Sequence, residues 1–234
     1  MPREPLMART YLGHVLPDRL DDKIVPSRTA LLVIDMQNDF VHDDGHCAKA
    51  FGRPMVTGFQ GVVAPIKRLA AAARAAAVAV LYSRVVQQPD GSLASAVWLA
   101  DNLRFGFEPL HCMYGTWGWQ IVDELAPQPG DAVFDKIRRS AFIGTQLDNM
   151  LRARDIRAIV ATGIAGTGCV ESTVRDAIER DYFTVVAADC IANNNAELTA
   201  ACEPVFRGLL APEDWTTSDT VIAAWTAAAP APGR

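Results

Sequence analysis

The sequence predicts a single α/β domain with a mostly parallel sheet. Short apolar runs recur along the 234 residues without the alternation of a half-exposed strand, as is typical of strands buried on both faces of a parallel sheet. Helical patterns separate these runs, and strands that alternate with helices favour a parallel sheet with right-handed crossovers. The length suits one domain of this kind, and no internal repeat divides it.

Composition and charge exclude several other classes of protein. The apolar share of 50% excludes a disordered chain. The longest apolar run, residues 69–81, is interrupted by Arg74 and is too short to span a membrane. The net charge is −5, and the longest basic cluster lies at residues 136–139, whereas nucleic-acid binders need a basic face. We therefore expect a small-molecule substrate, and neither nucleic acid nor a membrane as a partner.

Residues 1–28 are interpreted as an N-terminal arm. Prolines at positions 2, 5, 17 and 26 interrupt any helix, and mixed acidic and basic residues suggest a surface strap. The arm lacks the apolar centre of a signal peptide. The five cysteines lack the spacing of a disulfide framework, so we expect a cytoplasmic protein with reduced thiols.

The folded domain is expected to span residues 29–226. It begins with an apolar run over residues 29–35 that ends in a carboxylate, Asp35. Further strands are expected at residues 77–82, 132–134, 158–162 and 184–188. Helices are expected at residues 61–76, 145–154 and 169–180, where apolar side chains recur at helical spacing. Residues 227–234 are rich in Ala and Pro, and we expect a frayed tail there.

Three chemically capable residues follow strands in this pattern: Asp35, Lys136 and Cys169. Ligands of open parallel sheets bind at the carboxyl ends of the strands, so the predicted fold brings these residues to one edge. Asp35 and Lys136 each have an ordinary structural explanation, as a turn cap and a solvated cation. Cys169 is the strongest candidate, because it follows a Gly-rich turn at residues 162–168 and is expected to open a helix. Backbone N–H groups and the helix dipole would lower its pKa there and could bind an oxyanion.

These three residues together form a catalytic device that needs no histidine. The thiolate acts as the nucleophile, the carboxylate takes its proton, and the ammonium keeps the carboxylate ionised. The signature motifs of serine hydrolases, zinc proteases and P-loop nucleotide-binding proteins are absent from the sequence, and no dinucleotide fingerprint is complete.

Two other segments offer weaker sites. Residues 42–47 hold two histidines, two aspartates and a cysteine that could ligate zinc. No second cluster completes a metal shell, so we expect a solvated loop there. Trp117 and Trp119, with Tyr114, could line a pocket, or they could pack in the core or at a subunit interface.

Several motifs together resemble the isochorismatase-like cysteine hydrolases. They comprise residues 30–40, read as Ala-Leu-Leu-Val-Ile-Asp-Met-Gln-Asn-Asp-Phe, Lys136 followed by Ser140-Ala-Phe142, and residues 163–173 around Cys169. The resemblance implies a Rossmann-like, three-layer α/β/α fold with a mostly parallel sheet of about six strands. It also implies a homodimer or homotetramer.

The resemblance further implies roles for particular residues. It implies a catalytic triad of Asp35, Lys136 and Cys169, and a cis peptide bond between Ile164 and Ala165. The backbone amides of Ala165 and Cys169 would then form the oxyanion hole. The implied chemistry is hydrolysis through a covalent acyl- or carbamoyl-cysteine intermediate.

The presence of Cys169 favours an amide hydrolase, since isochorismatases proper cleave a vinyl ether and lack this cysteine. Nicotinamidases carry a metal site with a histidine near the second strand, and residues 82–89 contain none. We therefore expect no metal and no cofactor. The remaining relatives act on linear carbamoyl or ureido compounds: ureidoacrylate, biuret and N-carbamoylsarcosine amidohydrolases. The resemblance thus implies cleavage of a C–N bond of a small linear amide, with release of ammonia.

The sequence departs from these relatives at two places that bear on the substrate. Gly166 stands where the family usually has Thr, and residues 85–89 replace an Asn-Gly-Trp segment of the ureidoacrylate type.

Candidate substrate-binding residues are Phe40, Trp117, Arg138 and Phe142. Arg139 is an alternative to Arg138, since a guanidinium of either could bind a substrate carboxylate. The alternatives for the whole chain are a nicotinamidase- or isochorismatase-type hydrolase and a non-catalytic binding protein of the same fold.

Overall fold

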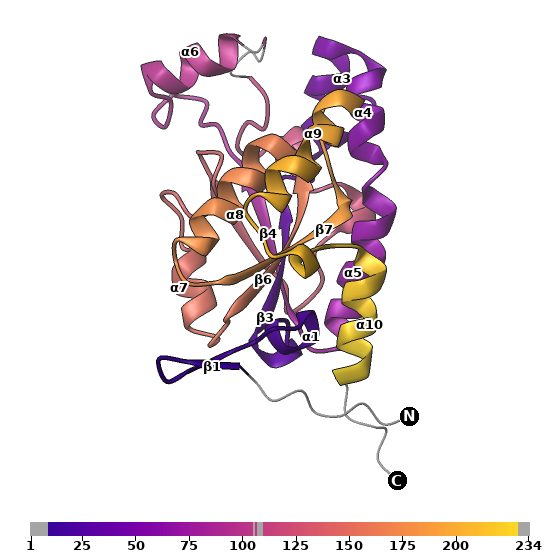
Figure 1. Ribbon diagram of the computed structural model, residues 1–234. Coiled ribbons are helices and arrows are strands. Elements are labelled where there is room, and N and C mark those ends of the chain that lie inside the picture. Colours follow the sequence, from indigo (N-terminus) through magenta and orange to yellow (C-terminus); the bar gives the residue numbers. More distant parts are fainter. Residues whose placement is uncertain (1–8, 105, 107–109, 229–234) are drawn as a thin grey trace.

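The computed structural model describes residues 9–104, 106 and 110–228, and a six-stranded sheet forms its centre (Figure 1). All the strand pairs in this sheet are parallel, in the order β5-β4-β3-β6-β7-β8. The strands are β3 (Thr29–Ile34), β4 (Ala79–Val85), β5 (Ala132–Lys136), β6 (Ala158–Ile164), β7 (Phe183–Ala192) and β8 (Trp215–Thr216). The prediction of a mostly parallel sheet of about six strands is confirmed.

The central strand β3 explains why apolar runs without alternation mark this sheet. All six of its residues are buried. Leu31 and Val33 point into one hydrophobic core, and Leu32 and Ile34 point into the other. Each face of a parallel sheet is covered by helices, so both sets of side chains must be apolar.

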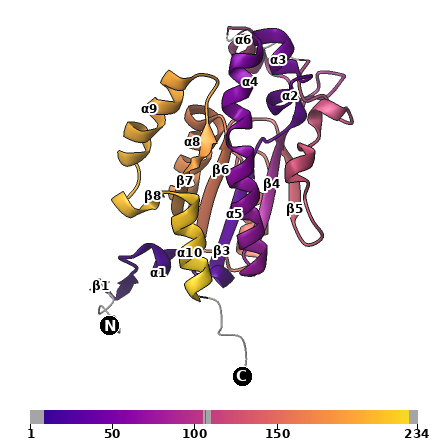
Figure 2. The ribbon, with the colours of Figure 1, turned by 90° about the vertical axis from the view of Figure 1, so that its right-hand side faces the viewer.

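Two layers of helices enclose the sheet (Figures 1 and 2). One face is covered by α4 (Arg53–Gln60), α5 (Val63–Ala75) and α10 (Ser218–Ala228). The other face is covered by α7 (Leu147–Arg152), α8 (Glu171–Ile178) and α9 (Ala196–Arg207). Two short helices, α2 (Asn38–Val41) and α3 (His46–Phe51), precede α4. The structure is therefore the three-layer α/β/α arrangement that the family resemblance implies.

Several predicted boundaries differ from the observed ones. The strand expected at residues 184–188 is twice as long, because an irregularity in its pairing with β6 lets β7 run from Phe183 to Ala192. The helix expected at 169–180 begins as a π-helical turn, Gly166–Val170, and continues as α8. The two-residue strand β8 and the helices α6 (Ala96–Arg104), α9 and α10 were not predicted.

The described part of the N-terminal arm holds more structure than the prolines suggest. A hairpin of β1 (Arg9–Tyr11) and β2 (His14–Leu16) leads to the four-residue helix α1 (Leu20–Lys23). This helix fits between the prolines at positions 17 and 26. At the other end, α10 continues through residue 228, and residues 229–234 of the expected tail lie outside the described residues. Within the part of the chain that the structure describes, no helix has the length and apolar character of a membrane span.

Candidate active site

The carboxylate of Asp35 is fixed at the carboxyl end of the central strand. Asp35 follows β3 directly and adopts a left-handed backbone conformation, with φ of 57°. Its backbone N–H donates to the carbonyl oxygen of Ser83 at 3.1 Å, and its Oδ1 accepts a hydrogen bond from Ser83 Oγ at 2.9 Å. The neighbouring strand β4 thus holds both the backbone and the side chain of Asp35, which is buried.

The ammonium group of Lys136 connects this carboxylate to a thiol. Lys136 is the last residue of β5, and its side chain is fully buried. Its Nζ lies 2.8 Å from Asp35 Oδ2 and donates to Cys169 Sγ at 3.3 Å. It also donates to the carbonyl oxygen of Arg138 at 2.9 Å. The structure therefore brings Asp35, Lys136 and Cys169 together from three different strand ends.

A glycine allows β6 to approach β3 closely beneath this site. Gly163 has φ of 107°, and a Cβ atom there would lie 2.1 Å from the carbonyl oxygen of Ile34. Only glycine fits such a contact between backbones. The next peptide bond, between Ile164 and Ala165, is cis, at the position that the family resemblance implies.

The loop after β6 turns tightly and presents Cys169. The N–H groups of Gly168 and Val170 both donate to the carbonyl oxygen of Ala165, at 3.0 and 3.1 Å. The turn over residues 166–170 is π-helical, a form that often occurs at functional sites. Cys169 lies in this turn and is half-buried on the wall of a cavity.

The structure explains why glycine stands at position 166, where the family resemblance implies Thr. A Cβ at this position would lie 2.5 Å from Cys202 Sγ on α9 and 3.1 Å from Asn193 Nδ2. Asn193 Nδ2 lies 3.1 Å from the same sulfur, and its Oδ1 accepts hydrogen bonds from the N–H and the Oγ1 of Thr167. The space that a larger side chain would need is thus filled by groups that hold the turn.

Burial determines the protonation of the cysteine at rest. It raises the pKa of Cys169 to about 12, and the nearby Asp35 carboxylate adds to this rise, while Lys136 opposes it. The expectation of a lowered pKa is therefore wrong, because desolvation outweighs the ammonium group. For Lys136, burial alone would lower the pKa, but the interactions of its ammonium group with Asp35 and Cys169 raise it overall. At neutral pH the site holds a thiol beside a charged ammonium group.

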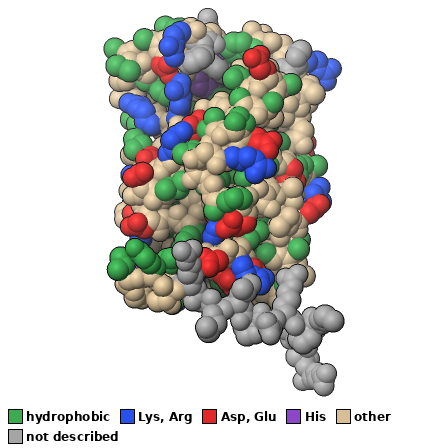
Figure 3. Space-filling view, in the orientation of Figure 1, with side chains coloured by type: hydrophobic (Ala, Val, Ile, Leu, Met, Phe, Trp, Pro, Cys, Tyr) green, Lys and Arg blue, Asp and Glu red, His purple; other side chains and the backbone are tan. Residues whose placement is uncertain are grey.

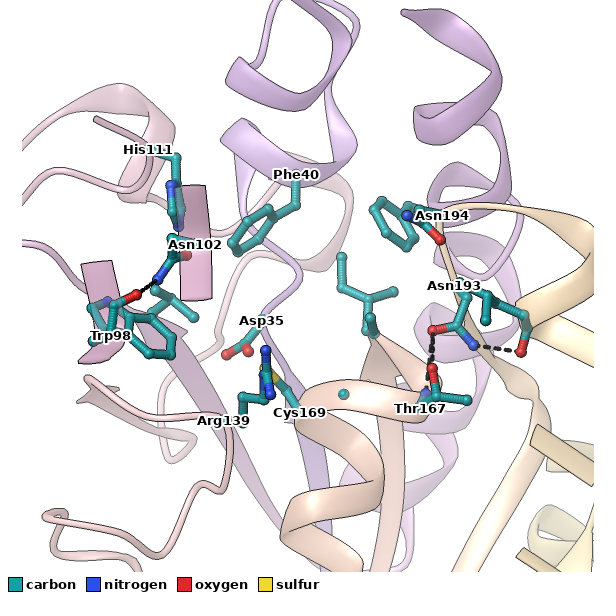
Figure 4. A pocket seen from close by; sticks show the side chains of 16 residues that line it. Asp35, Phe40, Trp98, Asn102, His111, Arg139, Thr167, Cys169, Asn193 and Asn194 are labelled. Atoms are coloured by element: carbon teal, nitrogen blue, oxygen red, sulfur yellow. Dashed lines mark hydrogen bonds between the residues drawn. The ribbon is translucent and has the colours of Figure 1, made fainter. Parts of the chain in front are cut away.

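The site opens into a cavity of about 290 Å³ at the carboxyl edge of the sheet (Figure 4). Its walls come from the loop after β6, from the segments after β3 and β7, and from helix α6. Most of its lining side chains are apolar or uncharged; Phe40, Phe59, Val85, Trp98, Asn102 and Asn193 are among them. Such a cavity fits a small ligand with few charges.

The predicted substrate-binding residues separate into two groups. Phe40 lines the cavity, whereas Trp117, Arg138 and Phe142 are not among the lining residues. Trp117 is 46% exposed. Phe142 is buried in the core against Tyr182, with ring centroids 5.9 Å apart. The lining of this cavity therefore does not support Trp117 as a pocket wall, nor Arg138 and Phe142 as substrate-binding residues.

Arg138 and Arg139, which the sequence could not separate, have different positions. The guanidinium of Arg138 donates to the carbonyl oxygen of Ile137 and lies 5.6 Å from the centre of the Trp98 ring. Arg139 lines the cavity and forms an ion pair with Asp101 on α6.

Sequence reasoning missed Ser83 and Asn193, although both lie near the carboxyl ends of strands. The rule that led to Asp35 applies to them as well. Asn193 was hidden because the strand before it was expected to end at residue 188, whereas β7 ends at Ala192. Ser83 lies within β4 rather than after it, and a serine inside a strand gives no signal in the sequence.

The segment 42–47 does not form the solvated loop that was expected throughout. Residues 42–45 form a turn, and α3 begins at His46, with Cys47 fully buried. Among the residues that the structure describes, no group of three or more His, Cys, Asp or Glu side chains is arranged to hold a metal ion.

A family model described as the Isochorismatase domain matches residues 29–203. The chain belongs to the isochorismatase family. This family match spans β3 to β7 and therefore includes Asp35, Lys136 and Cys169.

Proteins similar to this chain include an amidohydrolase and an amidase. The chain is 40% identical to the ureidoacrylate amidohydrolase RutB of Methylorubrum extorquens, over 77% of this chain and 75% of that protein. Among solved structures, a cysteine hydrolase from Pseudomonas syringae pv. phaseolicola 1448A has a TM-score of 0.75, with 29% identity and coverage of 88% and 96%. The N-carbamoylsarcosine amidase of Thermoplasma acidophilum has a TM-score of 0.65, with 29% identity and coverage of 82% and 97%.

Proposed function

We propose that this protein is a cysteine-dependent amidohydrolase. It cleaves a C–N bond of a small linear amide, carbamoyl or ureido compound and releases ammonia. One observation carries the proposal: Lys136 Nζ lies 2.8 Å from Asp35 Oδ2 and 3.3 Å from Cys169 Sγ, at the wall of a cavity. The relatives named as a ureidoacrylate amidohydrolase and an N-carbamoylsarcosine amidase support the reaction type.

The first half of the reaction forms a bond between Cys169 and the substrate. Asp35 accepts the thiol proton as Sγ attacks the carbonyl carbon. General base help of this kind contributes roughly 10²–10⁴-fold to the rate. The carbonyl oxygen becomes an oxyanion, which the backbone N–H groups of Ala165 and Cys169 bind; loss of one such donor costs on the order of 10²–10³-fold.

The second half releases the products. The tetrahedral intermediate collapses, the C–N bond breaks, and ammonia leaves with the proton that Asp35 had taken. Cys169 then carries an acyl or carbamoyl group as a thioester. Asp35 deprotonates a water molecule that attacks this group, and the proton returns to the sulfur as the acid leaves.

Lys136 supports both halves by its fixed charge. Its Nζ lies 2.8 Å from Asp35 Oδ2, so its positive charge faces the carboxylate that accepts the proton. Its hydrogen bond to Sγ stabilises the negative charge that develops on sulfur during attack. This explains how a thiol whose pKa lies near 12 at rest can act at neutral pH: the proton moves during the attack rather than before it.

The test is an ammonia-release screen over four groups of compounds: simple primary amides, ureido acids, biuret and nicotinamide. We expect release from at least one linear amide or ureido compound at a rate well above that from nicotinamide. Ammonia release from nicotinamide alone, with activity that depends on added metal, would contradict the proposal.

A further inference from the structure

We infer that Asn193 is a positioning residue for the reaction: its side-chain amide holds Thr167, and through it the turn that presents Cys169, in the geometry that attack requires. The inference rests on the proposed function, because it concerns the nucleophile of that reaction. It assigns to Asn193 an effect on kcat that operates through the backbone of the turn.

The turn that carries Cys169 has few side chains that can fix it to its surroundings. Gly166 and Gly168 have none, and the sulfur of Cys169 must remain available for the reaction. Val170 anchors the carboxyl end of the turn, because its side chain is fully buried in the core. Thr167 is therefore the residue through which the amino-terminal half of the turn can be held.

Asn193 supplies the contact to Thr167. Its Oδ1 accepts a hydrogen bond from the backbone N–H of Thr167 at 3.2 Å and a second one from Oγ1 at 3.1 Å. Asn193 is only 2% exposed, whereas Thr167 borders the cavity. If the asparagine side chain is removed, both donors lose their shared acceptor, and the turn can shift toward the cavity, where water satisfies them.

The other end of the asparagine side chain is fixed to helix α9. Its Nδ2 donates to the carbonyl oxygen of Leu198 at 2.8 Å and to Cys202 Sγ at 3.1 Å. The backbone N–H of Asn193 donates to Thr199 Oγ1 at 3.0 Å. The amide thus uses its oxygen toward the turn and its nitrogen toward the helix, so it transmits the position of α9 to the turn.

The hydrophobic core in turn holds helix α9. Cys202 and Phe206 are buried on its inner side, and the Phe206 ring stacks on Trp215 of β8 with ring centroids 5.3 Å apart. Acidic, basic and apolar side chains are mixed over the face of the molecule where α8 and α9 lie, as on a solvent-exposed face (Figure 3). Asn193 therefore connects the turn to an element whose inner side is fixed by packing.

The position of the turn matters because it sets two parts of the reaction at once. The Sγ of Cys169 must stay near Lys136 Nζ, which lies at 3.3 Å, and the backbone N–H of Cys169 must face the oxyanion. Misplacement of reacting groups by about 1 Å can cost on the order of 10²-fold in rate. The contacts that bind the rest of the substrate change less, so the effect falls on kcat rather than on KM.

Asn195, two residues further along the chain, supplies a matched control. Its Oδ1 accepts a hydrogen bond from the backbone N–H of Leu198 at 2.8 Å and caps the start of α9. Asn195 is not among the residues that line the cavity. Asn195→Ala therefore removes the same kind of side chain from the same helix start and lowers stability, but it leaves the contact to Thr167 in place.

The experiment measures ammonia release from biuret, 3-ureidopropionate and propionamide, and it compares kcat and KM for the probe that the wild type hydrolyses fastest. Asn193→Ala should lower kcat roughly tenfold or more and change KM by less than about threefold. Asn195→Ala should lower the urea midpoint of unfolding and keep kcat within about twofold of the wild type.

A double-mutant cycle tests whether the contact itself is responsible. Thr167→Val loses the hydroxyl donor and should lower kcat, whereas Thr167→Ser keeps this donor and should retain more of it. The double variant Asn193→Ala with Thr167→Val should be no slower than Asn193→Ala alone, because the hydroxyl group has already lost its acceptor.

Each contrary result has a definite meaning. If Asn193→Ala lowers the urea midpoint but not kcat, or if Asn195→Ala lowers kcat as much, the inference is wrong while the proposed function stands. The same holds if the two single effects on kcat multiply in the double variant. If Asn193→Ala does not fold, equal kcat of Thr167→Val and Thr167→Ser overturns the inference. No ammonia release by the wild type from any compound of the screen refutes the proposed function and this inference with it.

Discussion

Lys136 and Asp35 form a fully buried ion pair, with Nζ 2.8 Å from Oδ2, at the carboxyl ends of two strands that are not neighbours. Strand β4 lies between them and contributes Ser83, whose hydroxyl group donates to Asp35 Oδ1. The pair places a permanent positive charge beside a thiol that lines a cavity. A pair in this position costs desolvation free energy, which a catalytic role explains better than stability does.

Removal of the ammonium group should destabilise the protein as well as inactivate it. Lys136→Met keeps most of the side-chain volume but leaves the buried Asp35 carboxyl group without its ion-pair partner, which costs about 3–5 kcal/mol. The free energy of unfolding from urea titration measures this loss, and ammonia release measures the loss of activity. The double variant Asp35→Asn with Lys136→Met removes both charges, so it should regain much of the stability and none of the activity. Equal stability of wild type and Lys136→Met would contradict the buried pair.

The pH dependence of alkylation tests the state of the thiol. Because the pKa of Cys169 is about 12, the thiolate fraction between pH 7 and 10 should rise roughly tenfold per pH unit. Iodoacetamide labelling of Cys169, followed by mass spectrometry, should rise in the same way. A plateau in the labelling rate near pH 7 would show that the thiol is already ionised at rest.

Labelling of Cys169 in an Asp35 variant distinguishes the residue that accepts the proton from the residue that attacks the substrate. Asp35→Asn keeps the hydrogen bond from Ser83 but removes the negative charge that raises the pKa of Cys169. Labelling at pH 8 should therefore become faster, on the order of tenfold, since a neighbouring charge shifts a pKa by about 1–3 units. Turnover should be lost at the same time. Slower labelling of this variant would contradict the assigned contacts.

Substitution at Gly166 should disturb the turn that carries Cys169. In Gly166→Ala the new Cβ meets Cys202 Sγ at 2.5 Å, and overpacking of this kind costs about 1–3 kcal/mol. Unfolding free energy and kcat should both fall. The double variant with Cys202→Ala makes room for the methyl group and should recover part of both.

Gly208→Ala is a suitable control for this series. It places a Cβ at 3.4 Å from the carbonyl oxygen of Val205 at the end of the same helix, in ordinary contact and far from the turn. Its stability should change by about 0.5 kcal/mol or less. If Gly166→Ala behaves like this control, the turn tolerates the extra methyl group and the packing explanation is wrong.

The sequence predicts the part of this site that depends on strand ends. Asp35 follows a fully buried apolar run, and Lys136 lies two residues after the short run at residues 132–134, so their meeting at one sheet edge follows from the fold class. The raised pKa of Cys169 could not be predicted, because it depends on how completely neighbouring elements remove water from the sulfur.

The positions of residues on irregular segments could not be predicted from the sequence either. Asn193 reaches the turn because β7 is extended across an irregularity in its pairing with β6. Asp101 reaches Arg139 because α6 projects from the loop after β4. Neither feature follows from hydrophobic periodicity, since few apolar contacts determine the path of these segments.

The most direct test of the account is ammonia release by Cys169→Ala. The variant should keep the unfolding transition of the wild type, since Cys169 is half-buried and its replacement removes one sulfur atom at a cavity wall. With a substrate found in the screen, we expect no release above the uncatalysed rate. Substantial ammonia release by the correctly folded Ala variant would contradict the role of Cys169 as the nucleophile.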